Sequence, residues 1–327
     1  MKAKAVVFTD RLKVAVQAVD LPEPKNDEVV IDVAYSWISI GTESSFFRGD
    51  RIGGERLRKE SDPLPFPHVP GYQKVGTIRS VGAAVTGLAV GDRVFASISW
   101  VSNMFFKAAG HVSPAVTPAN QVWKLPIEAD PIDYAGLVLT QVGYNCGSRP
   151  TVHSGDLAIV IGDGLVGQWT AQTLRHSGAR VIVLGRHNER LQFLPRGIER
   201  INTKETPLQE ALQQNNGISI VVDTVGDMQT VRNIQPFMKR NSHLVSAGFL
   251  ADTGLVDIQS FREQEITLHA PSGWTKDRMD QTLDGIRQGW LQVSNLITHR
   301  YPVDQAEEAW NTILKKEQPC LGVILEW

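Results

Sequence analysis

In the middle of the chain, continuous apolar runs alternate with amphipathic segments, and this pattern predicts the strands and helices of a parallel α/β sheet. The run Val181–Leu184 is apolar throughout, as expected for a strand that is buried on both faces. An amphipathic segment from about 165 to 177 precedes it and ends at Gly178, which suits a helix C-terminus. Similar strands are predicted at 218–223 and 243–249. We therefore expect a doubly wound parallel sheet in this region.

Shorter strands, punctuated by glycine and proline, dominate the first third of the chain. They are predicted at 4–8, 28–34, 76–81 and 93–96. This spacing is typical of a small, partly open β-barrel. After residue 273 the pattern becomes helical and ends in a strand at 322–326, which we expect to return to the first domain. The predicted domains are a β-rich one over 1–138 and 273–327, and an α/β one over 139–272.

The composition of the 327 residues is that of an ordinary globular protein, with 42% hydrophobic residues, 21% charged residues and a formal net charge of −2. This balance does not favour nucleic acid as a partner. No apolar run approaches the length of a membrane span, and the first residues lack the apolar stretch of a secretory signal. The two cysteines, Cys146 and Cys320, cannot build a disulfide framework. We expect a cytoplasmic protein without membrane or nucleic-acid partners.

The segment 160–167 carries the chemistry of the α/β domain. Apolar residues lead into G-x-G-x-x-G, and a helix follows. In this context Gly162 permits a tight turn, Gly164 lets the backbone approach a pyrophosphate, and Gly167 lets helix and strand pack closely. The helix N-terminus, with Leu165 and Val166, offers free N–H groups to the anion. The motif predicts a dinucleotide site in a Rossmann-type sheet, and a glycine-rich turn without a ligand is the alternative.

The residues after the second strand of this sheet favour NADP(H) over NAD(H). An acidic residue about 20 positions past the glycines would bind the ribose 2′-hydroxyl of NAD. Gly185 occupies that position, and Arg186, His187 and Arg190 follow it. Because a guanidinium suits a phosphate, the missing carboxylate and the added cations predict NADPH as the cofactor. The alternative is that these cations form the solvated start of the next helix.

Further residues are predicted to lie near the cofactor, because ligands of doubly wound sheets bind outside the carboxyl ends of the strands. Val225, Ala247, Gly248 and Phe249 follow the later strands. Thr140 lies where the segment that connects the two domains is expected to approach the nicotinamide. The alternative is that Gly248 serves only to form a turn.

The order of a β-rich domain, a G-x-G-x-x-G domain and a C-terminal return resembles the medium-chain dehydrogenase/reductase superfamily, in which the first domain is a GroES-like barrel. The segments 70–76 and 90–94 belong to this resemblance, which covers nearly the whole chain. The motifs at 39–43 and 69–76 are similar to the bacteriochlorophyllide a dehydrogenase-like branch, which is implied to oxidise a secondary alcohol. Zinc-free quinone and enoyl reductases are the other relatives implied. The resemblance also implies a homodimer, paired through a predicted edge strand at 265–269.

The positions that hold catalytic zinc in the zinc-dependent alcohol dehydrogenases carry other residues here. Ile40 stands in place of a cysteine, Tyr72 stands in place of the histidine of Gly-His-Glu, and the third ligand falls in the apolar stretch 137–139. A catalytic zinc takes about three nitrogen, sulfur or oxygen ligands from the protein, which these residues cannot supply. His68 and His111 are lone histidines, which are more often structural or solvated than ligands. The resemblance therefore implies an enzyme without a metal.

Without zinc, hydrogen-bond donors must stabilise the negative charge that develops on the substrate oxygen during hydride transfer. Tyr72 has a phenol that can donate, and Gln73 is its neighbour. Thr42 and Glu43 are candidates to orient a donor or relay a proton. The alternatives are that Glu43 is a first-turn carboxylate favoured by the helix dipole, that Tyr72 is a packed loop aromatic, and that solvent protonates the product.

Three functions fit these observations. The first is an NADPH-dependent, zinc-free reductase of a conjugated C=C or a carbonyl in a small or medium apolar substrate. The second is an alcohol dehydrogenase that oxidises a secondary hydroxyl. The third is a non-catalytic NADPH-binding protein, because a fold does not determine a function. Phe46, Phe47 and Trp274 are candidates to line an apolar pocket, although core packing explains most aromatic residues.

Overall fold

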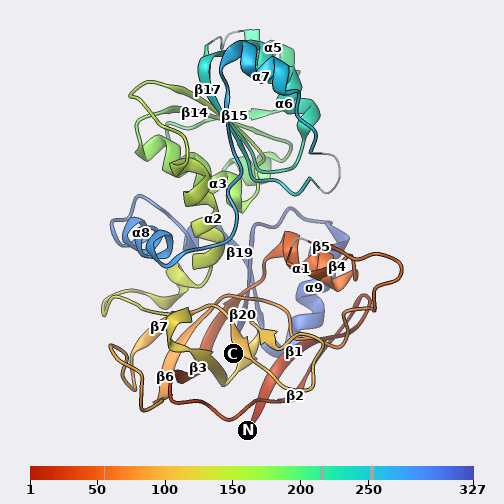
Figure 1. Ribbon diagram of the computed structural model, residues 1–327, viewed down its shortest axis with the longest axis vertical. Coiled ribbons are helices and arrows are strands. Elements are labelled where there is room, and N and C mark those ends of the chain that lie inside the picture. The colour runs from red at the N-terminus through yellow and green to blue at the C-terminus, as the bar shows by residue number, and fades with distance from the viewer. Residues whose placement is uncertain (55, 214, 216, 251–253) are drawn as a thin grey trace. The chain divides into compact units, whose positions relative to one another are not determined.

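The computed structural model describes residues 1–54, 56–213, 215, 217–250 and 254–327. They form two compact units, Met1–Val138 together with Val293–Trp327, and Leu139–Gln292 (Figure 1). Residues 273–292 group with the second unit, whereas the sequence pattern assigned them to the first. The reason is local packing, since Arg278 donates to Asn145 Oδ1 at 3.1 Å and the Trp290 ring stacks on His176 at a centroid distance of 4.0 Å.

The second unit is built on a parallel sheet with the order β15-β14-β13-β16-β17-β18. Every neighbouring pair in this order is parallel. This is the strand order of a Rossmann-type doubly wound sheet, so the predicted fold class is confirmed. Its strands are β13 (Leu157–Ile161), β14 (Arg180–Gly185), β15 (Glu199–Asn202), β16 (Ile218–Asp223), β17 (Met238–Ser246) and β18 (Thr267–His269).

Alternating side chains of these strands build a core on each face of the sheet. In β13, Ala158 and Val160 pack in one cluster with Ala171 and Leu174 of α3. The intervening Ile159 packs in the opposite cluster, to which α5, α6 and α7 contribute. Since successive side chains of a strand point to opposite faces, burial on both faces requires an apolar residue at each position. The helices of this unit are α2 (Leu137–Ser148, which begins in the first unit), α3 (Leu165–His176), α4 (Asn188–Leu191), α5 (Leu208–Gln213), α6 (Met228–Ile234), α7 (Ile258–Gln264) and α8 (Lys276–Arg287).

The first unit is β-rich, as the sequence predicted. Its main sheet has the order β12-β7-β6-β3-β11-β8-β9, and the C-terminal strand β20 pairs with both β3 and β19. A second sheet has the order β10-β1-β2, and β4 pairs with β5. The N-terminal strands are β1 (Lys2–Asp10), β2 (Lys13–Asp20), β3 (Glu28–Trp37), β4 (Arg51–Gly53), β5 (Arg56–Leu57), β6 (Lys74–Val81) and β7 (Arg93–Ala96). The others are β8 (Ser99–Trp100), β9 (Ala108–Ala109), β10 (Val112–Ser113), β11 (Ala115–Pro118), β12 (Val122–Lys124), β19 (Ile297–Pro302) and β20 (Gly322–Glu326), and the helices are α1 (Ile40–Phe47) and α9 (Ala306–Lys315).

One strand end differs from the sequence prediction in a way that matters for the site. The predicted strand at 243–249 ends at Ser246. The chain turns there because the N–H groups of Ala247 and Gly248 both donate to the carbonyl oxygen of Asp223, at 2.8 and 3.0 Å. The predicted edge strand is β18, which lies at the end of the sheet, and the homodimer stays a prediction.

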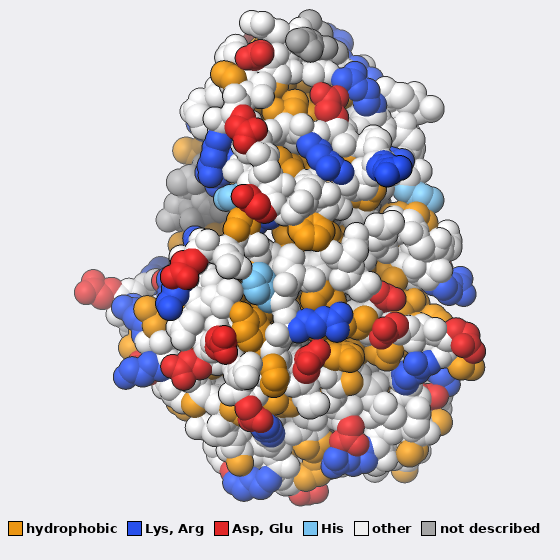
Figure 2. All heavy atoms as spheres, turned by 180° about the vertical axis from the view of Figure 1, so that it is seen from behind, with side chains coloured by type: hydrophobic (Ala, Val, Ile, Leu, Met, Phe, Trp, Pro, Cys, Tyr) orange, Lys and Arg blue, Asp and Glu red, His pale blue; other side chains and the backbone are white. Residues whose placement is uncertain are grey.

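The distribution of charge on the surface and the apolar character of the helices agree with the amino-acid composition. On the face shown in Figure 2, Lys and Arg side chains are interspersed with Asp and Glu side chains. Within the described part of the chain, no helix is both long and apolar enough to cross a membrane.

Candidate functional site

The turn after β13 has the geometry that a pyrophosphate requires. Gly162 has a φ of +119°, and a Cβ on Gly167 would lie 2.1 Å from the carbonyl oxygen of Gly162. The first turn of α3, which contains Leu165 and Val166, therefore lies directly on the strand end. A Cβ on Gly164 would meet nothing within 4 Å, so open space lies beside the N-cap of α3. A helix N-terminus beside open space is a ready site for an anion.

The loop after β16 is organised by the carboxylate of Asp223, which is fully buried. It accepts the backbone N–H groups of Val225 and Gly226 at 2.9 Å and of Asp227 at 3.0 Å. A buried carboxylate needs such donors, and here they fix the turn at the carboxyl edge of the sheet. Sequence reasoning treated Asp223 only as a strand end.

The loop after β17 lies against this turn. A Cβ on Gly248 would lie 1.9 Å from the backbone nitrogen of Gly226, so only glycine allows the contact. The side chains of Val225 and Phe249 remain 48% and 43% exposed. The structure thus brings together the predicted cofactor neighbours Val225, Ala247, Gly248 and Phe249 at one edge of the sheet.

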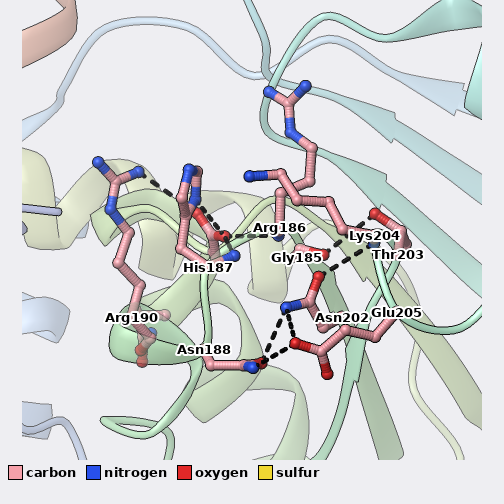
Figure 3. A network of polar contacts seen from close by, with 11 residues as sticks. Gly185, Arg186, His187, Asn188, Arg190, Asn202, Thr203, Lys204 and Glu205 are labelled. Atoms are coloured by element: carbon pink, nitrogen blue, oxygen red, sulfur yellow. Dashed lines mark hydrogen bonds and ion pairs between the residues drawn. The ribbon is translucent and has the colours of Figure 1, made fainter.

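The three cations after β14 have different surroundings. Arg186 has an exposed side chain, and its backbone N–H donates to Asp163 Oδ2 at 2.7 Å. His187 places both its backbone nitrogen and its Nδ1 2.9 Å from the same oxygen. Arg190 Nη1 lies 3.4 Å from Asp163 Oδ1. Two of the predicted phosphate ligands therefore contact a carboxylate of the glycine motif, and Arg186 projects outward (Figure 3).

A fourth cation, Lys204, lies at the neighbouring strand end. Thr203, just after β15, donates its backbone N–H to the carbonyl oxygen of Gly185 at 2.8 Å, and its hydroxyl does so at 3.1 Å. This pairing holds Lys204 next to the end of β14, with an exposed side chain. In Figure 3 the side chains of Arg186 and Lys204 both extend away from Asn202 and Glu205. Sequence reasoning missed Lys204 because the short strand β15, which positions it, was not predicted.

Thr140 and its neighbour Gln141 are both buried on α2. Among the described residues, neither amide atom of Gln141 has a hydrogen-bond partner. Buried polar atoms are nearly always paired, so this amide has hydrogen-bonding capacity to offer a ligand or water.

In the first unit, three of the predicted catalytic residues lie together. The phenol of Tyr72 donates to Ser39 Oγ at 2.6 Å. Glu43, in the first turn of α1, accepts the backbone N–H of Ser39 at 2.7 Å through Oε1. Burial, together with the negative charge of Glu43, raises the pKa of Tyr72 to about 12, although hydrogen bonds to Ser39 and Thr42 oppose this. The phenol is therefore a protonated donor at neutral pH.

The other oxygen of Glu43 binds a residue that the sequence left as a lone histidine. Glu43 Oε2 lies 2.9 Å from Nε2 of His111, and His111 Nδ1 lies 2.9 Å from Ser36 Oγ. Both members of the pair are buried, with exposed fractions of 2% and 0%. Gly71 permits this contact, since a Cβ there would lie 2.8 Å from His111 Nε2. The Glu43 carboxylate thus both caps the helix, as the alternative expected, and holds a buried histidine.

The remaining candidates of this unit have other surroundings. Gln73 is fully buried, and its Nε2 donates to the carbonyl oxygen of Trp37 at 3.4 Å. His68 lies among aromatic rings that include Phe46, and burial lowers its pKa to about 4. Phe47 is buried in the core of this unit. Gln73 and Phe47 thus have structural surroundings, whereas Tyr72, Thr42 and Glu43 form one polar group.

Two positions where the resemblance expects zinc ligands carry Ile40 and Tyr72. Ile40 begins α1, and Tyr72 is hydrogen-bonded to Ser39. Over the described ranges, no three His, Cys, Asp or Glu side chains are grouped so that they could hold a metal ion.

A groove of about 590 Å³ on the first unit is separate from these residues. It is lined by His299, Tyr301, Gln305, Glu307, Glu308, Asn311, Thr312, Lys315, Glu317 and Gln318. None of them is a candidate site residue.

Comparison with known proteins agrees with the fold. Residues 25–126 match the alcohol dehydrogenase GroES-like domain. This match lies in the β-rich part of the chain, where the resemblance to the medium-chain dehydrogenase/reductase superfamily predicts such a domain.

Individual relatives are similar along their whole length. The chain is 26% identical to the 2-desacetyl-2-hydroxyethyl bacteriochlorophyllide A dehydrogenase of Cereibacter sphaeroides, over 100% of this chain and 99% of the relative. It superimposes with a TM-score of 0.86 and 20% identity on a short chain alcohol dehydrogenase from Escherichia coli CFT073 complexed with NADH, over 100% and 99% of the two chains. A protein from Sinorhizobium meliloti 1021 bound to NADP gives a TM-score of 0.82 at 18% identity, over 100% of each chain.

The buried pair of Glu43 and His111 generates a stability prediction. Replacing Glu43 with Ala removes the hydrogen-bond partner of the His111 ring and of the Ser39 N–H, so we expect a loss of about 2–5 kcal/mol in the free energy of unfolding. Glu43→Gln keeps an acceptor and should cost less. Urea unfolding of the three proteins measures the difference, and Glu60→Ala on the surface is the control, expected within about 0.5 kcal/mol of the wild type. Equal midpoints for Glu43→Ala and the control would contradict the prediction.

Proposed function

We propose that this chain is an NADPH-dependent, zinc-independent oxidoreductase that transfers a hydride between NADP(H) and a small or medium apolar substrate with a carbonyl or a conjugated C=C. Similarity to the alcohol dehydrogenase GroES-like domain, and the similar structures bound to NADH or NADP, support a nicotinamide cofactor. One observation supports the preference for NADPH. The exposed side chains of Arg186 and Lys204 lie beside the end of β14, where Gly185 is the last residue.

The cofactor preference follows from charge and space at the ends of β14 and β15. NADP differs from NAD by a phosphate on the adenosine ribose, which is bound near the end of the second strand in this fold. Gly185 presents no carboxylate of its own there, and Arg186 and Lys204 present two exposed positive charges. An arginine fork binds a phosphate through two hydrogen bonds, and a lysine adds a point charge.

The proposed chemistry in the first unit centres on Tyr72. The bound dinucleotide supplies the hydride. As the substrate accepts it, negative charge develops on the substrate oxygen, and a donor held in place stabilises that charge. The Tyr72 phenol is protonated and its position is fixed by Ser39, which is bound in turn to Glu43. Tyr72 is the proposed hydrogen-bond and proton donor, with Thr42 and Glu43 as orienting groups. Its hydroxyl, which donates to Ser39 Oγ in the structure, would turn to the substrate oxygen while the Ser39 hydroxyl donates back to the phenol oxygen.

A second candidate function is oxidation of a secondary alcohol. The full-length similarity to the Cereibacter sphaeroides bacteriochlorophyllide dehydrogenase favours it. The same residues would serve, because a donor that stabilises a substrate alkoxide acts in either direction of the reaction. Turnover of NADPH with ketones, enones and quinones, compared with turnover of NADP with secondary alcohols, distinguishes the two. Binding of NADPH without any turnover would instead support a non-catalytic protein.

The cofactor preference predicts tighter binding of NADPH than of NADH. Fluorescence titration measures both dissociation constants. Arg186→Ala should weaken NADPH by about 1–3 kcal/mol and leave NADH nearly unchanged, because only NADPH carries the phosphate. Arg196→Ala, which removes another exposed arginine of the same unit, is the matched control. Equal or tighter binding of NADH by the wild type would refute the preference.

The donor role predicts that Tyr72→Phe lowers kcat about tenfold to a hundredfold, as loss of a donor at a developing charge does. Tyr301→Phe is the control, since it removes a hydroxyl that binds Thr312 in the same unit. Steady-state kinetics with the best substrate of the panel measures both variants. An unchanged kcat in Tyr72→Phe would leave water as the proton donor.

The proposed metal-free chemistry predicts that activity survives exhaustive chelation, and that elemental analysis of the purified protein finds far less than one zinc per chain. The physical reason is the donor set, because Ile40 and Tyr72 stand at two of the three ligand positions. One zinc per chain, lost together with activity on chelation, would overturn this part of the proposal.

A further inference from the structure

The glycine motif contributes a carboxylate to the very place where the second strand lacks one. Asp163 lies between the first two glycines of the motif and is 6% exposed. A Cβ on Gly185 would lie 2.7 Å from the Cβ of Asp163 and 2.9 Å from its Oδ2. Position 185 therefore has to be glycine to leave room for Asp163, independently of any role in binding a phosphate. The carboxylate at this edge is contributed by the glycine motif and not by the end of β14.

Much of the acceptor capacity of this carboxylate is used by the protein itself. Its Oδ2 accepts the backbone N–H groups of Arg186 and His187 and contacts the His187 ring, and its Oδ1 faces Arg190. Burial alone would raise the pKa of Asp163, but the hydrogen bonds from Arg186 and His187, with the charges of His187 and Arg190, hold it below its usual value. Asp163 thus stays ionised while its charge is offset within the loop.

These contacts have opposite consequences for the two cofactors. A ribose 2′-hydroxyl of NAD needs a carboxylate with a free acceptor, and the acceptors of Asp163 are directed into the loop. A 2′-phosphate needs cations and an absence of uncompensated negative charge. Because one oxygen binds two consecutive N–H groups, the backbone at Arg186 is fixed and its side chain leaves the loop on the outer side (Figure 3).

We infer that Asp163 is a positioning residue for cofactor specificity, which holds the turn after β14 so that Arg186 meets the 2′-phosphate of NADPH. This role rests on the proposed function. Asp163 acts through Arg186 and does not touch the phosphate. His187 and Arg190 serve the same turn as partners of Asp163.

The test compares two probes that differ only in the 2′-phosphate, adenosine 2′,5′-bisphosphate and adenosine 5′-monophosphate. Calorimetry on the full chain gives their affinity ratio. We expect Asp163→Ala to lower this ratio about tenfold, the effect of losing one charge-assisted contact. Asp163→Asn should restore most of it, because the amide oxygen still accepts the two backbone N–H groups. Asp257→Ala, which removes a carboxylate that accepts the N–H groups of Gln259 and Ser260, should leave the ratio unchanged.

A double-mutant cycle with Arg186→Ala identifies the route of the effect. If Asp163 acts through Arg186, Asp163→Ala changes the ratio less than about twofold in the Arg186→Ala background. An equal change in both backgrounds would overturn the inference, as would a ratio that rises in both Asp163 variants, since that marks Asp163 as a repelling charge. A wild type without preference for the bisphosphate would refute the proposed cofactor as well. A wild type with the preference and an unaffected Asp163→Ala would refute the inference alone.

Discussion

A buried carboxylate has to find donors for both of its oxygens, and the candidate site regions of both units are built around that requirement. Glu43, Asp163 and Asp223 are 2%, 6% and 0% exposed. Each accepts at least one backbone N–H from a loop or helix end beside it. Removing such an acceptor leaves buried donors unpaired, so the loop conformation and the carboxylate depend on each other. Hydrogen bonds to these carboxylates therefore help to fix the loops that carry the candidate site residues.

Glu43 and Asp163 each bind backbone N–H and a histidine ring, but they fix different residues. Glu43 binds the N–H of Ser39 and the ring of His111, and thereby fixes the hydroxyl that Tyr72 contacts. Asp163 binds two N–H groups and the ring of His187, and thereby fixes the backbone of Arg186. In each case the carboxylate does not contact the proposed ligand itself. It positions the residue that would contact it, which is Tyr72 for Glu43 and Arg186 for Asp163. That arrangement keeps a negative charge close to the site while its acceptors are occupied by the protein.

The sequence predicted the second unit well because its signals are local. A strand buried on both faces is apolar at each position, and the glycine motif, its helix and the next strand follow within a short stretch. The first unit was harder to predict: β2 was missed because only Val19 of its eight residues is fully buried, so that its pattern is weak. The contact of Glu43 with His111 joins residues 68 positions apart and depends on the turn at Gly71. The sequence around His111 gives no local signal for this contact. Lone polar residues acquire partners only when the fold is complete.

At the end of β14, the residue type at position 185 alone is not enough to predict the cofactor. Gly185 was interpreted as the absence of a carboxylate, yet a carboxylate lies against it, contributed by residue 163. What separates the two cofactors is then whether that carboxylate has a free acceptor, since a hydroxyl needs one and a phosphate is repelled by its charge. Here two backbone N–H groups and an imidazole occupy Oδ2, and an arginine faces Oδ1. Under the proposed preference for NADPH, the same aspartate without those donors would favour NAD, and the specificity would belong to the whole loop and its hydrogen bonds.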